Sequence, residues 1–323
     1  MAWTHAKKKK AKKKILKSIF GKALPIVLIL VALFAVGCNY LYENNESFRG
    51  FVDELGIIST QAPTIPAIDP DGSEMAVHFI DVGQGDSTLF QTPQGNVLVD
   101  CGESEYGDDV VAYLNAQGVK ELEYFIITHP DSDHMGCAAY VLENITVKNF
   151  VMNGQEKSTK FFEKALNVLE NKKIDSLIAA PGDVFTVGAL QLKIYGPQAH
   201  LVESDEWNEA SLIIHATYGN RSFLLTGDAE TEGEADLLKY YKNNIKSDVF
   251  SAGHHGSRTS NSPELLAAVQ PTYVVISCGK DNSYGHPHQE ALDAFESVAA
   301  KVYRTDELGS IVFITDGTNL TKK

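Results

Sequence analysis

The sequence predicts an α/β domain over residues 75–323 of this 323-residue chain. From Met75 onward, short apolar runs alternate with stretches of helical periodicity, the pattern of strands connected by helices. Hydrophobic residues make up 44% of the chain, which is enough for a substantial core and too many for wholesale disorder. The length leaves room for a short N-terminal segment and one large domain or two small ones.

The chain begins with a basic segment that is followed by an uncharged one. Residues 1–22 contain nine lysines and no acidic residue, and residues 23–42 contain no charged residue. As a helix rising about 1.5 Å per residue, the uncharged segment would span roughly 30 Å, the hydrocarbon thickness of a bilayer. We therefore expect a basic cytoplasmic tail at 1–22, one transmembrane helix at 23–42 and an extracellular body, because lysines mark the cytoplasmic side.

Two other interpretations of the uncharged segment remain open. It can be read as a signal peptide cleaved before Cys38, which would then be acylated as in a lipoprotein, or as a buried helix of a soluble protein. Both the transmembrane helix and the lipid would anchor the body at the outer face of the membrane. Residues 43–74 contain three prolines and an Asp-Gly pair, so they are expected to form a linker.

The charge of the chain limits the partners that it can bind. The net charge is −14, and beyond the N-terminal lysines the chain carries 19 basic and 42 acidic residues. This balance argues against a protein that coats long nucleic acid through a broad basic face. It allows a phosphate ester held at a metal centre, because the metal ion supplies its own positive charge.

Two passages, residues 87–100 and 211–228, repeat one order of elements. Each is a predicted strand, a Gly-Asn turn and a second hydrophobic strand that ends in an aspartate, Asp100 or Asp228. If the similarity reflects a duplicated half-domain, both aspartates project at the same rim, whereas chance recurrence of a common hairpin is the alternative. Asp100 is expected to be structural.

The predicted strand at 124–128 leads into a loop with four potential metal ligands. These ligands are His129, Asp131, Asp133 and His134. Carboxylates beside imidazoles suit zinc, manganese or iron. The alternative is a polar loop whose carboxylates cap a helix that begins near Met135.

Two further predicted strands end at a pair of histidines flanked by glycine. The strand at 249–252 is followed by His254 and His255, and the strand at 273–277 by His286 and His288. Strand ends at one edge of a sheet converge, so these loops are expected to meet the loop that follows residue 128. Helices are expected at residues 157–173, 231–241, 263–269 and 289–299.

The cysteines show no paired spacing typical of a metal site. Cys101 and Cys278 both follow predicted strand ends, which would permit a disulfide outside the cell. Small packed thiols are the favoured interpretation.

Four segments resemble the metallo-β-lactamase superfamily and, within it, the extracellular domain of the ComEC competence-protein family. The segments are Phe79–Ser87, Thr128–Gly136, Leu225–Glu230 and Gly253–Ser257. The resemblance covers about residues 75–318 and implies an αββα sandwich with metal ligands in loops along one edge. ComEC proteins also carry many transmembrane helices that form a DNA channel. This chain has one predicted span, so it resembles the hydrolase domain alone.

The resemblance implies roles for the residues of the first histidine loop and for the second hairpin aspartate. His129, Asp133 and His134 match the main metal-binding motif of the superfamily. Asp131 occupies the position where most of the superfamily has a second histidine. Asp228 matches an aspartate that bridges two metal ions. The implied cofactor is one or two divalent metal ions, zinc or manganese.

Two later positions of the motif are less clear. One of His254 and His255 is expected to match a later histidine ligand, and His254 is favoured. A histidine that usually lies between the main motif and the bridging aspartate has no clear counterpart, and Asn208 stands nearest to its position. This loss and the Asp131 substitution favour a harder ion such as manganese.

The chemistry expected from these residues is metal-assisted hydrolysis of a phosphodiester, with single-stranded DNA as a candidate substrate. Asp133 is expected to bind metal or to orient the attacking water and accept its proton. His286 or His288 would contact the scissile phosphate or protonate the leaving oxygen, unless they only shape their loop. Residues expected to brace the ligand loops are Asp81, Gln84 and Asp86.

Two other functions remain open for the same scaffold. One is hydrolysis of a non-nucleic-acid ester of the cell envelope, or of a lactam or thioester, and the acidic surface slightly favours such small substrates. The other is binding without catalysis. The intact set of acids and histidines argues against this last function, because burying so much charge without a use is costly.

Overall fold

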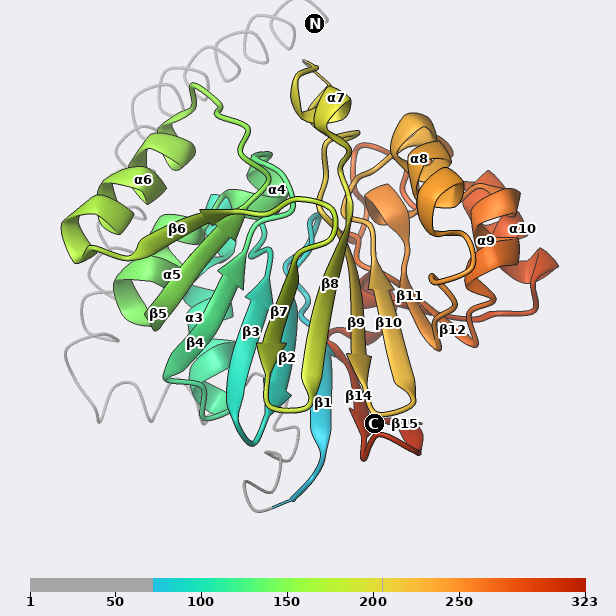
Figure 1. Ribbon diagram of the computed structural model, residues 1–323, viewed down its shortest axis with the longest axis horizontal. Helices are drawn as coiled ribbons and strands as arrows, with labels where there is room; N and C mark the ends of the chain where they lie inside the picture. The colour runs from blue at the N-terminus through green and yellow to red at the C-terminus, as the bar shows by residue number, and fades with distance from the viewer. Residues whose placement is uncertain (1–71, 205) are drawn as a thin grey trace, which may run out of the picture. The chain divides into compact units, whose positions relative to one another are not determined.

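Residues 72–204 and 206–323 are described in the computed structural model of the chain, and they form two β-sheets with helices on their outer sides (Figure 1). They belong to a compact unit at Ala62–Lys323. The predicted tail at 1–22, the predicted span at 23–42 and all but the end of the predicted linker lie outside the described residues. Among the helices in the described ranges, none combines the length and the apolar character that crossing a bilayer requires.

The first sheet joins antiparallel strands to parallel ones. Its order is β15-β14-β1-β2-β3-β4-β5-β6, antiparallel from β15 to β3 and parallel from β3 to β6. The strands are β1 (Met75–Phe79), β2 (Thr88–Thr92), β3 (Gly95–Val99), β4 (Glu121–Ile126), β5 (Thr146–Met152), β6 (Asp175–Ile178), β14 (Ile311–Thr315) and β15 (Leu320–Lys322).

The second sheet follows the same plan. Its order is β13-β12-β11-β10-β9-β8-β7, antiparallel from β7 to β10 and parallel from β10 to β13. The strands are β7 (Val184–Val187), β8 (Leu190–Gly196), β9 (Ile213–Tyr218), β10 (Arg221–Leu225), β11 (Val249–Ser251), β12 (Tyr273–Ile276) and β13 (Lys301–Arg304).

The two predicted hairpins occupy matching places in the two sheets. Strands β2 and β3 form the first and β9 and β10 the second, and each hairpin is continued by parallel strands. Asp100 and Asp228 therefore follow equivalent strands, which is the arrangement expected of a duplicated half-domain.

Helices cover the outer side of each sheet (Figure 1). The α-helices are α3 (Gly107–Ala116), α4 (Ser132–Met135), α5 (Ala138–Asn144), α6 (Lys160–Lys172), α7 (Ala199–Val202), α8 (Thr231–Tyr241), α9 (Pro263–Val269), α10 (Gln289–Ser297) and α11 (Thr305–Leu308), with 3-10 turns η1 (Ser104–Tyr106) and η2 (Gly253–Gly256). The four predicted helices correspond to α6, α8, α9 and α10. Helix α9 shows why such a segment is readable from sequence: Ser262 accepts a hydrogen bond from the Leu265 amide, and Pro263 occupies the first turn.

Three apolar cores separate the layers and establish the αββα order. A central core lies between the sheets, where Phe90 of β2 meets Phe223 of β10 edge to face at a centroid distance of 6.1 Å. A second core packs α3, α5 and α6 against the first sheet, and a third packs α8, α9 and α10 against the second. The predicted αββα sandwich is confirmed for the described residues.

The parallel strands deliver the predicted ligand loops to one edge. Strands β4, β10, β11 and β12 each run into a loop that carries the predicted aspartates or histidines. Cys101, Cys137 and Cys278 are buried and free, so the interpretation as packed thiols is confirmed for these three.

Candidate metal centre

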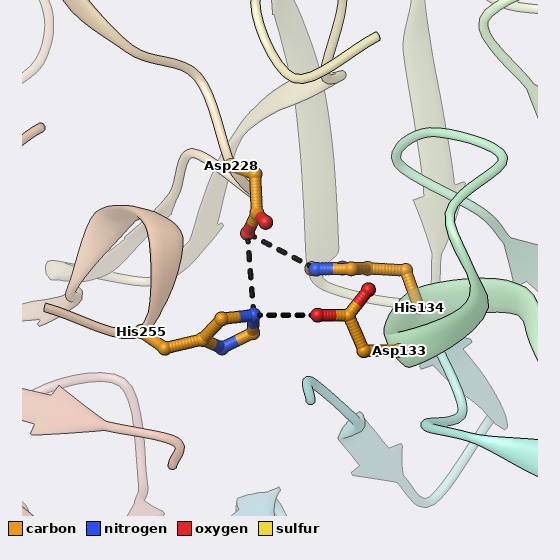
Figure 2. Close-up of side chains that lie close together, drawn as sticks. All are labelled: Asp133, His134, Asp228 and His255. Carbon is orange, nitrogen blue, oxygen red and sulfur yellow. Dashed lines mark hydrogen bonds and ion pairs between the residues drawn. The ribbon is translucent and has the colours of Figure 1, made fainter. Parts of the chain in front are cut away.

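Four side chains from three segments of the chain converge at this edge: Asp133, His134, Asp228 and His255 (Figure 2). Their ligand atoms all lie within 4.8 Å of one another. His134 Nε2 is 3.0 Å from Asp228 Oδ1, and His255 Nε2 is 3.2 Å from Asp133 Oδ2 and 3.6 Å from Asp228 Oδ1. All four were predicted as site residues, and the fold brings them together across more than 120 residues of sequence.

The Gly-rich loop after β1, residues 82–86, packs against the backbone of Asp133 and supports the cluster there. A Cβ at Gly85 would lie 2.3 Å from the carbonyl oxygen of Asp133, so glycine is required for the close approach of the two backbones. The amide of Asp86 donates to the same carbonyl at 3.1 Å. Gln84 Oε1 accepts from the Gly279 amide at 3.1 Å, whereas Asp81 accepts only from its own turn, at the Gly83 amide.

In each of three histidines, the Nδ1 side of the ring is engaged away from the cluster. His134 Nδ1–H donates to Asp100 Oδ2 at 2.8 Å, and His255 Nδ1–H donates to the Ser277 carbonyl at 3.0 Å. His129 Nδ1 lies 3.2 Å from the Ser211 hydroxyl oxygen and 3.2 Å from that of Thr128. Such contacts orient each ring so that Nε2 faces the aspartates of the site, the usual arrangement in metal-binding histidines.

The free donor atoms fit a divalent cation. In the described part of the chain, His129 Nε2 is buried and makes no hydrogen bond. His134 Nε2 and Asp228 Oδ1 are also buried, and they have no hydrogen bond beside the ion pair that they form with each other at 3.0 Å. Leaving such groups unsatisfied is costly, and a cation among them would satisfy several at once. Two or more imidazoles with two carboxylates are a donor set that zinc, manganese and iron all accept.

The charges in the cluster are strongly coupled. Burial raises the pKa of Asp228, but the nearby His134 and His255 more than offset this and hold it well below its usual range. Burial lowers the pKa of His134, yet Asp228 and Asp100 raise it well above its usual value. A cation that binds His134 Nε2 must displace this proton, so metal affinity is expected to fall as the pH falls.

His129 is the exception among these histidines. Burial and the neighbouring His134 lower its pKa to about 4, so the ring is neutral at pH 7 with a lone pair available. Its Nε2 lies 4.0 Å from Asp228 Oδ2.

Asp131 and His254 lie outside the four-residue cluster. The carboxylate of Asp131 is bound by Lys157 Nζ. The Nε2 atom of His254 is 3.6 Å from Asp228 Oδ2, and its Nδ1 is 3.0 Å from Glu230 Oε1. His255, and not the preferred His254, joins the close cluster, and which of the two binds metal stays a prediction.

His286 lies beside His254, and His288 lies beside His286. Neither belongs to the four-residue cluster. The His286 ring is mostly buried, 5.4 Å from the His254 ring, and its pKa is lowered to about 4 by burial and by the neighbouring histidines. His288 Nδ1 accepts a hydrogen bond from the Arg258 amide at 3.1 Å, so one of its nitrogens shapes the loop.

Several residues that organise the site were not anticipated. Asp100 was expected to be structural, but its particular partner was not predicted: it accepts a hydrogen bond from His134 Nδ1. It also accepts from the amide and the hydroxyl of Thr128, each at 2.8 Å. Ser211, Glu230 and Lys157 carry no sequence signal for their roles, because their contacts form only once the chain has folded: Ser211 with His129, Glu230 with His254 and Lys157 with Asp131.

We expect Asp100→Asn to weaken metal binding by about 10- to 100-fold, because the amide gives His134 a weaker acceptor. Calorimetric titration of the purified chain with Mn²⁺ and Zn²⁺ measures the change, and circular dichroism checks the fold. The matched control is Asp248→Asn, since Asp248 also accepts from a backbone amide and pairs with Arg221 at the opposite end of β10. Equal affinity in the two variants would contradict the role of Asp100.

The chain matches known proteins in sequence and in fold. The family model of the metallo-beta-lactamase superfamily matches residues 80–280. ComE operon protein 3 of Bacillus subtilis is 36% identical over 259 residues, which are 75% of this chain and 33% of that protein. Competence protein ComA of Neisseria gonorrhoeae is 30% identical over 294 residues, which are 90% of this chain and 39% of that protein. The chain thus spans little more than a third of the length of these curated relatives.

A solved structure, the metallo-beta-lactamase fold protein YhfI from Bacillus subtilis, superposes with a TM-score of 0.51 at 13% identity, covering 75% of this chain and 99% of that one. At this identity the match supports the fold alone. With the family model covering most of the described body, the chain belongs to the metallo-β-lactamase superfamily, and its curated relatives are competence proteins of the ComEC family.

Proposed function

We propose that this chain is a metal-dependent phosphodiesterase that cleaves single-stranded DNA. The observation that carries the proposal is the convergence of Asp133, His134, Asp228 and His255, whose ligand atoms all lie within 4.8 Å of one another. A bound divalent cation would supply a nucleophile at neutral pH by lowering the pKa of water from about 15.7 towards about 7.

Asp133 is better suited to hold the cation or orient the water than to accept a proton. Burial raises its pKa, but the His255 hydrogen bond and the charge of His134 more than reverse this, so the pKa lies far below its usual value. A carboxylate with so low a pKa is a weak base.

His286 is suited to contact the phosphate as a neutral hydrogen-bond donor. With a pKa of about 4, the ring is neutral at pH 7, and its remaining N–H is too weak an acid to protonate a leaving oxygen. Its Nδ1 is buried without a partner among the described residues, so the ring retains hydrogen-bonding capacity.

Aromatic and basic groups near the ligand loops support a single-stranded substrate. Tyr284 is 63% exposed and stacks on His286 at a centroid distance of 5.6 Å. Lys157, which binds the Asp131 carboxylate, also lies 5.0 Å over the ring of Trp207. Base stacking on such rings tolerates an acidic body, because it needs no broad basic face. The names of the curated relatives refer to competence, which agrees with a DNA substrate.

A second candidate is a hydrolase of a small cell-envelope ester. The acidic composition favours it, since a small substrate needs no basic surface. Binding without catalysis is the third candidate.

We also propose that residues 23–42 anchor the hydrolase to the membrane with its body outside the cell. The support is the uncharged stretch of twenty residues and the lysines that precede it.

We expect Asp228→Asn to lower the rate of phosphodiester cleavage by about 10³-fold or more, because the carboxylate contributes several kcal/mol through the metal centre. The assays use bis-p-nitrophenyl phosphate and a single-stranded oligonucleotide with added Mn²⁺ or Zn²⁺. Asp293→Ala, at an exposed position of α10, is the control. Cleavage of neither substrate by the metal-loaded wild type, with turnover of an envelope ester, would favour the second candidate.

The two aromatic side chains are expected to act on the oligonucleotide alone. Trp207→Ala and Tyr284→Ala should each raise KM for single-stranded DNA about 5- to 150-fold, since stacking is worth about 1–3 kcal/mol per base. Hydrolysis of bis-p-nitrophenyl phosphate should change little. Tyr240→Ala, at an exposed tyrosine of α8, serves as the control. A parallel loss on both substrates would argue against a stacking role.

Protease added to intact cells should release the hydrolase body into the medium, because the linker at 43–74 would be outside. Immunoblotting of the medium and of the washed cells measures the release. A cytoplasmic protein followed in the same samples reports cell lysis. Complete protection of the body until the cells are lysed would reverse the proposed orientation.

A further inference from the structure

A groove lies between α5 and α6, on the outer side of the first sheet. Its cavity of about 610 Å³ is within the range of about 300–1,000 Å³ that is usual for ligand sites. Helix α6 packs against α5 and also contacts α4 (Figure 1). Gly136, which follows α4 directly, lines the groove. The groove therefore begins at the short helix that carries Asp133 and His134.

The α6 wall of the groove presents basic and amide side chains. Lys160, Lys164, Asn167 and Asn171 line this wall at intervals of three or four residues, so they share one face of the helix. At about 1.5 Å per residue, the row from Lys160 to Asn171 extends about 17 Å. Among the described residues that line the groove, Glu143 is the one acid.

The charge of this groove is opposite to the charge of the domain. Beyond the N-terminal lysines the chain carries 19 basic and 42 acidic residues. A cavity of about 510 Å³ between α8, α9 and α10 is lined by one arginine and three glutamates, and a cavity of about 550 Å³ beside His286 by two basic and three acidic residues. The groove at α6, with two lysines and one glutamate, is thus the one of these three that favours an anionic ligand.

A third lysine continues the row toward the metal centre. Lys157 precedes α6 by three residues and forms an ion pair with Asp131 of the first histidine loop. The loop that presents Lys157 is fixed to the rest of the domain, because the buried Asn153 donates to the Ala210 carbonyl at 2.7 Å. The three lysines therefore lead from the edge of the metal centre along α6.

The walls of the groove are held in place without its two lysines. At the end near α4, Ser104 Oγ donates to the Gly136 carbonyl at 2.8 Å. At the far end, Lys172 Nζ donates to two carbonyls in the last turn of α5 at 2.7 and 2.9 Å. Lys160 and Lys164 are exposed, and neither forms an ion pair with another described residue. Their ammonium groups are available to a ligand.

We propose that this groove binds the DNA strand that extends from the metal centre, with Lys160 and Lys164 on neighbouring phosphates. The proposal takes its DNA partner from the proposed function and rests on it. The two lysines are one helical turn apart, about 6 Å along the axis, which suits an extended single strand. The Tyr140 ring on the opposite wall is 37% exposed and offers a stacking surface to a base.

The test measures how DNA binding by the full chain, purified in detergent, depends on salt. The probe is a fluorescent single strand of about 12 nucleotides, and its anisotropy gives Kd in EDTA, so that cleavage does not interfere. The double variant Lys160→Gln/Lys164→Gln should bind about 10- to 30-fold more weakly at about 0.1 M salt. The slope of log K against log salt concentration should become shallower by about 1.4, because each phosphate contact of a single strand contributes about 0.7.

The matched control removes two exposed lysines from the helical layer of the second sheet. Lys239→Gln/Lys242→Gln changes the net charge equally at the end of α8 and should keep the slope and the affinity of the wild type. Calorimetric titration with Mn²⁺ and circular dichroism check that the metal centre and the fold are intact in both double variants.

The same measurements can overturn the proposal. Slopes that become equally shallow in the two double variants would do so, because they would report only the net charge of the chain. A groove variant that loses affinity for polyglutamate but not for DNA would also do so, since the groove would then fit an acidic peptide. A wild type that binds the strand through these lysines but does not cleave it with Mn²⁺ or Zn²⁺ would contradict the proposed cleavage while the groove stands.

Discussion

The metal centre depends on one buried imidazole held between two carboxylates. His134 places Nδ1 at 2.8 Å from Asp100 and Nε2 at 3.0 Å from Asp228, and all three side chains are almost fully buried. Asp100 follows β3 and Asp228 follows β10, the second strands of the two repeated hairpins. The ring therefore joins the two halves of the sandwich at the point where the ligand loops meet. Burying such a set is costly unless each charge is compensated, so the halves must pack in this register for the chain to fold well.

The electrostatics of the site separate its histidines into two kinds. Neighbouring carboxylates raise the pKa of His134 and of His255 well above the usual value, whereas His129 and His286 are neutral at pH 7. A cation competes with protons at the first kind and meets free lone pairs at the second. The two kinds differ because His134 and His255 face Asp228 Oδ1 and the others do not. The site can therefore hold positive charge although the domain as a whole is acidic.

The relation to the competence proteins concerns one part of those proteins. The chain covers 33% and 39% of the two curated relatives, and the family model matches the region that carries the sandwich and its ligand loops. What is shared is therefore the metallo-β-lactamase domain.

The sequence by itself determined the two hairpins, the strands that lead into the predicted ligand loops and four of the helices, and it named the residues of the close cluster. Strand periods, the Ser262 cap of α9 and the loop from His129 to His134 are local features, since propensity and spacing act over a few residues. Only the tertiary structure decided which ring of the His254–His255 pair enters the close cluster, because neighbouring left-handed residues project in different directions. The tertiary structure also decided that Lys157 forms an ion pair with Asp131 and that Asp100 accepts a hydrogen bond from His134. These contacts join segments 26 and 34 residues apart, and they exist only once the packing of strands and helices has brought those segments together.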